Sequence, residues 1–307
     1  MMKKYILILI ILGVTFSNLF AQEEEADPVY AFNSGILIDA QTSYIPDART
    51  LEFVIQHKFG ALKNGKSDLW GIYAPGANIR LSLNYVPIKN FQIGAGITSN
   101  NMYTDLNAKW KVLQQKTSGM PVSLTLFGNL AIDGRNAETL GKGQTVDTKG
   151  LDRTATEIGL SDRFSYFSQA MVTRKFSDWA TLQAGASFTH YNMVKWDYDH
   201  DVVGLHFSGK IKFSPQGSFI FNYDKPLKIK DITEQWTWET HAKDNLAVGV
   251  EFFTFTHAFQ IYIGTAQGIL PQDNMMYNTN GVNFNDFTDS FKDNFAIGFT
   301  ITRIWMF

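Results

Sequence analysis

Cysteine is absent from the 307-residue chain, so disulfide bonds play no part in its fold. A dominant charge is absent too, since 27 Lys and Arg stand against 29 Asp and Glu, and charged residues make up only 18%. A nucleic-acid binder needs a basic excess, and a disordered chain has more charge and fewer aromatics than the 14% found here. Proline is scarce at 8 residues against 24 glycines, which fits tight turns rather than linkers.

Long hydrophobic runs are almost absent as well. The one nearly apolar stretch, residues 5–14, is shorter than the roughly 20 residues of a membrane-spanning helix. It follows Lys3 and Lys4 and precedes the small residue Ala21, with Leu19 at the less usual minus-three position. This pattern predicts a secretory signal peptide over residues 1–21, with an N-terminal anchor as the alternative. A lipoprotein is excluded because no Cys follows, and a mature protein in a membrane would have to be a closed barrel.

What the chain has instead is hydrophobic alternation with a period of two. In its cleanest stretch Ile79, Leu81 and Leu83 share one face, while Arg80 and Ser82 share the other. Such a period predicts a β-strand with one apolar face. Twelve such segments are found, at residues 50–60, 77–86, 91–98, 104–115, 121–132, 163–176, 179–191, 202–213, 217–224, 245–256, 258–266 and 292–307. Most have about the 9–11 residues with which a tilted strand crosses a bilayer.

Short and long connections alternate between these segments. The short ones are 87–90, 116–120, 177–178, 214–216 and 256–257, and the long ones are 61–76, 99–103, 133–162, 192–201, 225–244 and 267–291. Outer-membrane barrels have tight periplasmic turns, longer extracellular loops and an even strand number. We therefore predict an all-β fold, a transmembrane antiparallel up-and-down β-barrel of about 12 strands over residues 49–307, with residues 22–48 as a periplasmic N-terminal arm. The alternative, a soluble β-sandwich or lipocalin-like barrel, does not need this loop asymmetry.

Aromatic residues gather at the predicted periplasmic strand ends, where a girdle at the headgroup level is expected. The predicted girdle comprises Tyr85, Phe91, Phe176, Trp179, Phe213, Phe259, Trp305 and Phe307. The final segment resembles the C-terminal sorting signal of bacterial outer-membrane barrels, whose last residue is typically Phe. This resemblance implies recognition by the outer-membrane assembly machinery through the C-terminal strand. That strand should also pair with residues 50–60 to remove both sheet edges.

Four short motifs carry a wider resemblance. They read Ile-Gln-His-Lys-Phe-Gly at residues 55–60, Asp-Leu-Trp-Gly-Ile-Tyr at 68–73, Asn-Ile-Arg-Leu at 78–81 and Asp-Leu-Asn-Ala-Lys-Trp-Lys-Val-Leu-Gln-Gln at 105–115. Together they resemble the DUF5777 family of membrane-bound β-barrel proteins of Bacteroidota. The resemblance implies a barrel in the outer membrane of a bacterial cell. It implies no established activity and no catalytic residue.

The strand faces opposite the apolar ones are expected to line the lumen. The charged lumen candidates are Glu52, Lys58, Arg80, Asp105, Lys109, Lys111, His206, Lys210, Lys212 and Glu251. Buried charges must pair or meet water, and Glu52 on the neighbouring strand is the expected partner of Arg80. Two interpretations stay open, because these residues either cross-link the wall of a filled barrel or line an anion-favouring path.

Catalytic and metal-binding patterns are weak. His206 and Ser208 share a strand face, as in an outer-membrane phospholipase, but acyl chains do not reach a lumen, so no enzyme is predicted. Asp197, Asp199 and Asp201 alternate as in a Ca²⁺ loop but lack its remaining ligands, so no metal is predicted. Residues 236–238, Trp-Thr-Trp, suit loop packing better than a binding surface. No cofactor motif occurs.

The sequence thus predicts an outer-membrane barrel with a polar lumen, serving as a narrow passive channel or as a structural or accessory barrel. The alternatives are a lipid-modifying barrel enzyme and a surface-binding module that acts through the long loops. The expected partners are outer-membrane lipid, the assembly machinery and, for a channel, a small solute. Nucleic acid is not an expected partner.

Overall fold

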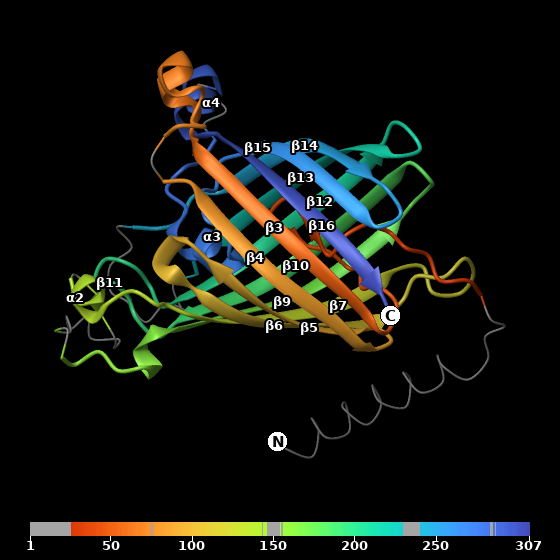
Figure 1. The fold of residues 1–307 in the computed structure, drawn as a ribbon, viewed down its shortest axis with the longest axis horizontal. Helices are drawn as coiled ribbons and strands as arrows, with labels where there is room; N and C mark the ends of the chain where they lie inside the picture. Colours follow the sequence, from red (N-terminus) through yellow and green to blue (C-terminus); the bar gives the residue numbers. More distant parts are fainter. Residues whose placement is uncertain are drawn as a thin grey trace.

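A closed barrel dominates the computed structural model, which describes residues 26–74, 76–142, 144–145, 154, 156–229, 240–282, 285 and 287–307 (Figure 1). Twelve antiparallel strands form it: β3 (Thr50–Ala61), β4 (Asn78–Ile88), β5 (Phe91–Thr98), β6 (Thr104–Leu113), β7 (Ser123–Ile132), β9 (Phe164–Lys175), β10 (Ala180–Tyr191), β12 (Asp201–Lys212), β13 (Gly217–Leu227), β14 (Asn245–Phe253), β15 (His257–Gly264) and β16 (Ala296–Met306). Each predicted segment supplies one strand, so the predicted fold is confirmed. The predicted signal peptide lies outside the described residues.

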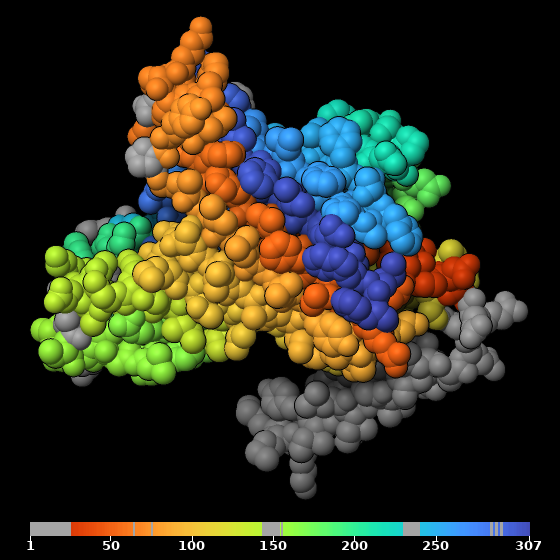
Figure 2. Space-filling model, in the orientation of Figure 1, coloured from red at the N-terminus to blue at the C-terminus, as the bar shows by residue number. Residues whose placement is uncertain are grey.

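The last barrel strand closes the sheet on the first. β16 pairs antiparallel with β3, with Thr302 opposite Val54 and Met306 opposite Thr50. Figure 2 shows β16 on the outer surface beside β3, as the register requires. No strand edge of the barrel is left unpaired, which removes the open edges that promote aggregation.

The two faces of the wall differ as the alternation predicts. On β4 the side chains of Arg80 and Ser82 are buried inside the barrel, whereas Ile79, Leu81 and Leu83 are exposed on its outer surface. Lipid would cover the outer apolar groups and remove them from water, which is favourable, while the polar groups keep polar partners inside. Among the described residues, no helix is long and apolar enough to cross a membrane.

All eight predicted girdle residues lie at the barrel end that carries the short turns and residue 307, and none of them is buried (Figure 1). Two of them pair with cations, since the guanidinium carbons of Arg174 and Arg303 lie 5.0 and 4.9 Å from the ring centroids of Phe176 and Trp305. An aromatic ring and a cation suit the headgroup level of a bilayer. Their placement at that level stays a prediction.

The chain before the barrel does not stay outside it. Residues 31–45, here called the lumen segment, fold into the barrel and form the hairpin β1 (Ile36–Leu37) and β2 (Ala40–Gln41). The tip residue Ile38 has φ of 58°, a conformation that costs a β-branched residue about 1–2 kcal/mol. The segment therefore differs from the expected periplasmic arm over residues 22–48.

The lumen segment has a buried apolar side as well as polar contacts. Phe32 and Leu37 belong to one buried cluster with Ile220 and Tyr262 of the inner wall. These inward apolar residues interrupt the polar lumen face of β13 and β15. Burial of such side chains stabilises the seated segment by about 1.5–3 kcal/mol each.

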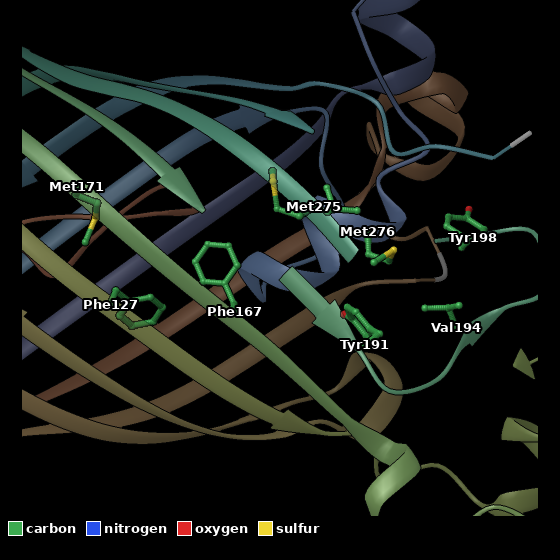
Figure 3. Packing of buried hydrophobic residues seen from close by; sticks show 9 residues of the cluster. Phe127, Phe167, Met171, Tyr191, Val194, Tyr198, Met275 and Met276 are labelled. Carbon is green, nitrogen blue, oxygen red and sulfur yellow. The ribbon is translucent and has the colours of Figure 1, made fainter. Parts of the chain in front are cut away.

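A helix lies inside the barrel at the end that carries the long connections, opposite residue 307 (Figure 1). α3 (Pro271–Tyr277) lies in the connection between β15 and β16, and its residues 272–276 are all buried. Figure 3 shows Met275 and Met276 of α3 beside the inward side chains Phe167 and Tyr191, with which they share a buried cluster. The alternation of loop lengths predicts an extracellular loop over residues 267–291. Its apolar turn instead packs on an apolar patch of the inner wall.

The other loop elements lie at the same end as α3, opposite residue 307 (Figure 1). They are the 3-10 helices η1 (Leu62–Asp68), η2 (Asn100–Met102) and η3 (Ser161–Arg163), the helices α2 (Ala137–Leu140) and α4 (Phe287–Asn294), and the strand pair β8 (Gln144–Thr145) and β11 (Val194–Lys195). The long connections therefore share one end of the barrel, as the alternation of loop lengths predicts.

Candidate functional site: a polar lumen closed by two segments

The structure places most of the charged lumen candidates inside the barrel. Glu52, Lys58, Arg80, Asp105, Lys109, Lys111, Lys210 and Glu251 are buried, and the side chain of His206 is 8% exposed. Lys212 is exposed at the last residue of β12, at the end of the short turns. The charges are therefore within reach of one another or of the lumen segment, with Lys212 as the exception.

Arg80 pairs with Asp105 rather than with Glu52, so the expected partner was wrong. Its Nε and Nη2 atoms donate to the two carboxylate oxygens of Asp105 at 2.9 and 2.7 Å, across the intervening strand β5. A Cβ atom on Gly96 of β5 would lie 2.7 Å from both groups, so the pair forms only because this residue lacks a side chain. Glu52 instead accepts hydrogen bonds from the side chains of Asn84 and Gln92 on the wall, and from Gly35 N of the lumen segment.

Lys58 joins the two closing segments. Its ammonium donates to Asp39 Oδ2 of the lumen segment at 2.8 Å. It also donates to the carbonyl oxygens of Ala266 and Gly268, each at 2.7 Å, in the chain that leads into α3. An ammonium has three N–H donors, so this buried cation is fully satisfied only while both segments are in place.

Glutamine side chains of the wall hold the backbone of the lumen segment. Gln260 accepts from Ile38 N at 2.8 Å and donates to Ile36 O at 2.9 Å. Gln183 accepts from Ser43 N at 3.1 Å and donates to Gln41 O at 2.6 Å. An amide side chain can bond a backbone N–H and a backbone C=O at the same time. These residues therefore bond backbone groups of the lumen segment that the β1–β2 pairing leaves without a partner.

Two further lysines of the wall are hydrogen-bonded as well. Lys109 donates to the carbonyl oxygen of Gly35 in the lumen segment at 2.8 Å, and Lys111 donates to Gln114 at 2.8 Å. Neither pairs with Asp105, which the arginine already occupies. With the segment seated, these cations cross-link the barrel and do not face an open path.

His206 lies in a hydrogen-bonded chain, but not with Ser208. Its Nδ1 is 2.8 Å from Asp224 Oδ1 and its Nε2 is 2.6 Å from Ser187 Oγ, which is the order of a Ser-His-Asp triad. The cavity beside His206 has a volume of about 10 Å³, room for one water, and is lined by Met275 and the lumen segment. A substrate does not fit there, so this chain of bonds links three strands of the closed barrel.

The aspartates of the predicted loop and the outward histidine do not form a common site. Among the residues that the structure describes, no three His, Asp or Glu side chains come together to hold a metal ion. Asp197 accepts a hydrogen bond from Thr240, whereas Asp201 lies 2.6 Å from His190 Nδ1. His57 lies on the outer face and stacks on Phe299. The motif at residues 236–238 lies outside the described residues.

Open space in the lumen is small, whereas the mouth is hollow. A second interior cavity, between Glu52, Arg80 and Lys109, also measures about 10 Å³. Above α3 a cavity of about 570 Å³ opens among the long loops. The two interior cavities are therefore each no larger than one water, and the larger cavity lies among the long loops.

Comparison with known proteins places the chain in a family. A family model described as "Membrane bound beta barrel domain (DUF5777)" matches residues 32–305. No curated protein matches the sequence. The fold resembles an outer membrane channel from Pseudomonas putida F1 at 12% identity and a TM-score of 0.48, over 86% of this chain and 97% of that one. It resembles the NanC porin at 6% and 0.45 and the KdgM porin at 7% and 0.43, each over 84% of this chain and 99% of theirs. With TM-scores below 0.5, these likenesses do not bear on function.

Proposed function

We propose that this chain, which belongs to the DUF5777 family of membrane-bound β-barrel domains, forms a gated channel in the outer membrane of a bacterial cell. The motifs that resemble this family in Bacteroidota support that location. The observation that carries the proposal is the lock at Lys58, where one buried ammonium holds both closing segments. A barrel that needed only to be filled would not need a single group shared by two separate segments.

The lumen segment is held by contacts that water can replace. Its links to Gln183, Gln260 and Lys109 are hydrogen bonds, each with a net value of about 0.5–1.5 kcal/mol once exchange with water is counted. The apolar contacts of Phe32 and Leu37 add stability to the closed state. The closed barrel is then the resting state, and displacement of the segment exposes a wall whose polar groups tolerate water.

Removal of the Lys58 ammonium should open the channel. In Lys58→Met the buried carboxylate of Asp39 keeps no cation, and such an uncompensated charge costs about 3–5 kcal/mol until the segment moves to water. In planar bilayers we expect rare, small openings for the wild type and a severalfold higher open probability for Lys58→Met.

Lys212→Met is the matched control, since it removes an exposed lysine outside the lock. It should behave like the wild type. Equal traces for both variants, in protein whose migration on gels remains heat-modifiable, would rule out the lock and favour a purely structural barrel.

A further inference from the structure

The mouth of the barrel holds a cavity that the gate does not explain. Its volume of about 570 Å³ falls in the range of small-molecule sites. Six amide side chains line it: Asn78, Asn100, Asn101, Gln267, Asn278 and Asn280. Asn78 and Asn278 already use both side-chain groups within the protein. The other four amides keep donors or acceptors that match a ligand whose hydroxyl groups also donate and accept.

One carboxylate in this cavity has an acceptor with no partner. Asp273 is 6% exposed, and its Oδ2 accepts from Asn100 Nδ2 at 3.0 Å. Its Oδ1 is fully buried and accepts no hydrogen bond from any described residue. Leaving a buried acceptor unsatisfied costs about 1–3 kcal/mol or more for a charged group. Asp273 lines the cavity, so rotation of its carboxylate would turn this oxygen toward a ligand hydroxyl, whose hydrogen bond removes that cost.

The charges at the cavity favour a neutral ligand over an anion. Arg135 lines it, but its guanidinium is already bound to both carboxylate oxygens of Asp133. Lys195 has no carboxylate within 4 Å among the described residues, and its Nζ lies 5.9 Å from the ring centroids of both Tyr198 and Tyr277. A single available cation is balanced by Asp273, so a ligand carboxylate would gain little and would be repelled at the unpaired oxygen.

We propose that the cavity binds a small neutral sugar, of mono- or disaccharide size, with one hydroxyl donating to Asp273 Oδ1. The amides bind the remaining hydroxyls, and the Tyr277 ring offers an apolar face. The binding site shares Gly268 and α3 with the gate, but it is already formed in the closed barrel, so binding needs no opening. Failure of the sugar to bind would leave the proposed channel untouched, and failure to conduct would leave the binding site untouched.

The test is calorimetric titration of the full-length protein in detergent with maltose as the probe. We expect saturable binding, weakened at least tenfold in Asp273→Ala. Asp178→Asn is the matched control, because Asp178 is a fully exposed carboxylate in a turn at the other end of the barrel, and it should bind as the wild type does. Asn100→Ala, which removes the donor to Asp273 Oδ2, guards against misfolding of the first variant and should also weaken binding.

The matched ligand pair is glucose and glucuronate, which differ in a carboxylate. Absence of maltose binding, equal binding by Asp273→Ala and wild type in heat-modifiable protein, or tighter binding of glucuronate than of glucose would each overturn the proposal. Weaker binding of glucuronate together with loss in both cavity variants would support it.

Discussion

Arg80 and Asp105 meet because residue 96 between them is a glycine. The alternation of the sequence places both charges in the lumen, since inward parity follows directly from the period of two. It does not give their pairing, because an arginine can reach across the neighbouring strand where that strand carries a glycine. The same limit applies to Lys58 and Lys109, whose acceptors lie on a segment that sequence parity does not place inside.

Gly96→Val should break the buried pair. The new side chain would occupy the space where the guanidinium and the carboxylate meet, and separation of a buried ion pair costs about 3–5 kcal/mol. The urea concentration at which heat-modifiable migration is lost should fall clearly. Ala95→Val, one residue away on the outer face, is the control, and equal midpoints for the two variants would show that the pair does not stabilise the wall.

At the scale of elements, the strands were predictable and the closing segments were not. Lipid on one face forces apolar residues at every second position, and this produces a pattern in the sequence. The lumen segment and α3 touch a mixed wall and carry no such pattern, so residues 22–48 resembled an arm and α3 resembled a polar loop. The available signal was a set of inward glutamines, Gln56, Gln183 and Gln260, whose amides suit an unpaired backbone.

The docking of α3 should depend on pH through Asp273. Burial raises the pKa of this carboxyl to about 6, although the hydrogen bond from Asn100 and the charge of Arg135 act to lower it. Asp133 raises it further and Lys58 lowers it. Because the docked helix has the higher pKa, its docking is most stable below about pH 4 and loses roughly 3 kcal/mol as pH rises from about 4 to about 6.

Open probability should therefore increase between about pH 4 and about pH 6.5 in single-channel recordings. Asp273→Asn keeps the shape of the side chain without its charge and should flatten this dependence. A variant with the same pH profile as the wild type would show that α3 docking does not respond to this carboxyl.

At the scale of the whole molecule, the charge of the wall depends on whether the lumen segment is seated. The twelve strands bury five cations and four carboxylates inside, and Asp39 of the segment offsets the excess positive charge. With the segment displaced, the wall keeps one excess positive charge, which favours anions weakly. The open lumen is then the anion-favouring path that the sequence suggested, and the closed lumen is the cross-linked barrel.

Reversal of two wall charges should reverse ion preference in the open state. Lys109→Glu with Lys111→Glu, made in a variant that lacks residues 31–45 and keeps Lys58, changes the one excess positive charge of the wall to a negative excess. Reversal potentials in a salt gradient should shift from weak anion to cation preference. Lys89→Glu with Lys212→Glu changes the same number of exposed charges and should leave the potential near its starting value.

The gate itself is tested most directly by deletion of residues 31–45, with the conductance of the purified barrel compared with that of the full chain in planar bilayers. We predict a long-lived conductance for the deletion variant, which the full chain shows only rarely. If the deletion variant migrates as a folded, heat-modifiable barrel and is as silent as the full chain, the lumen segment does not gate a channel.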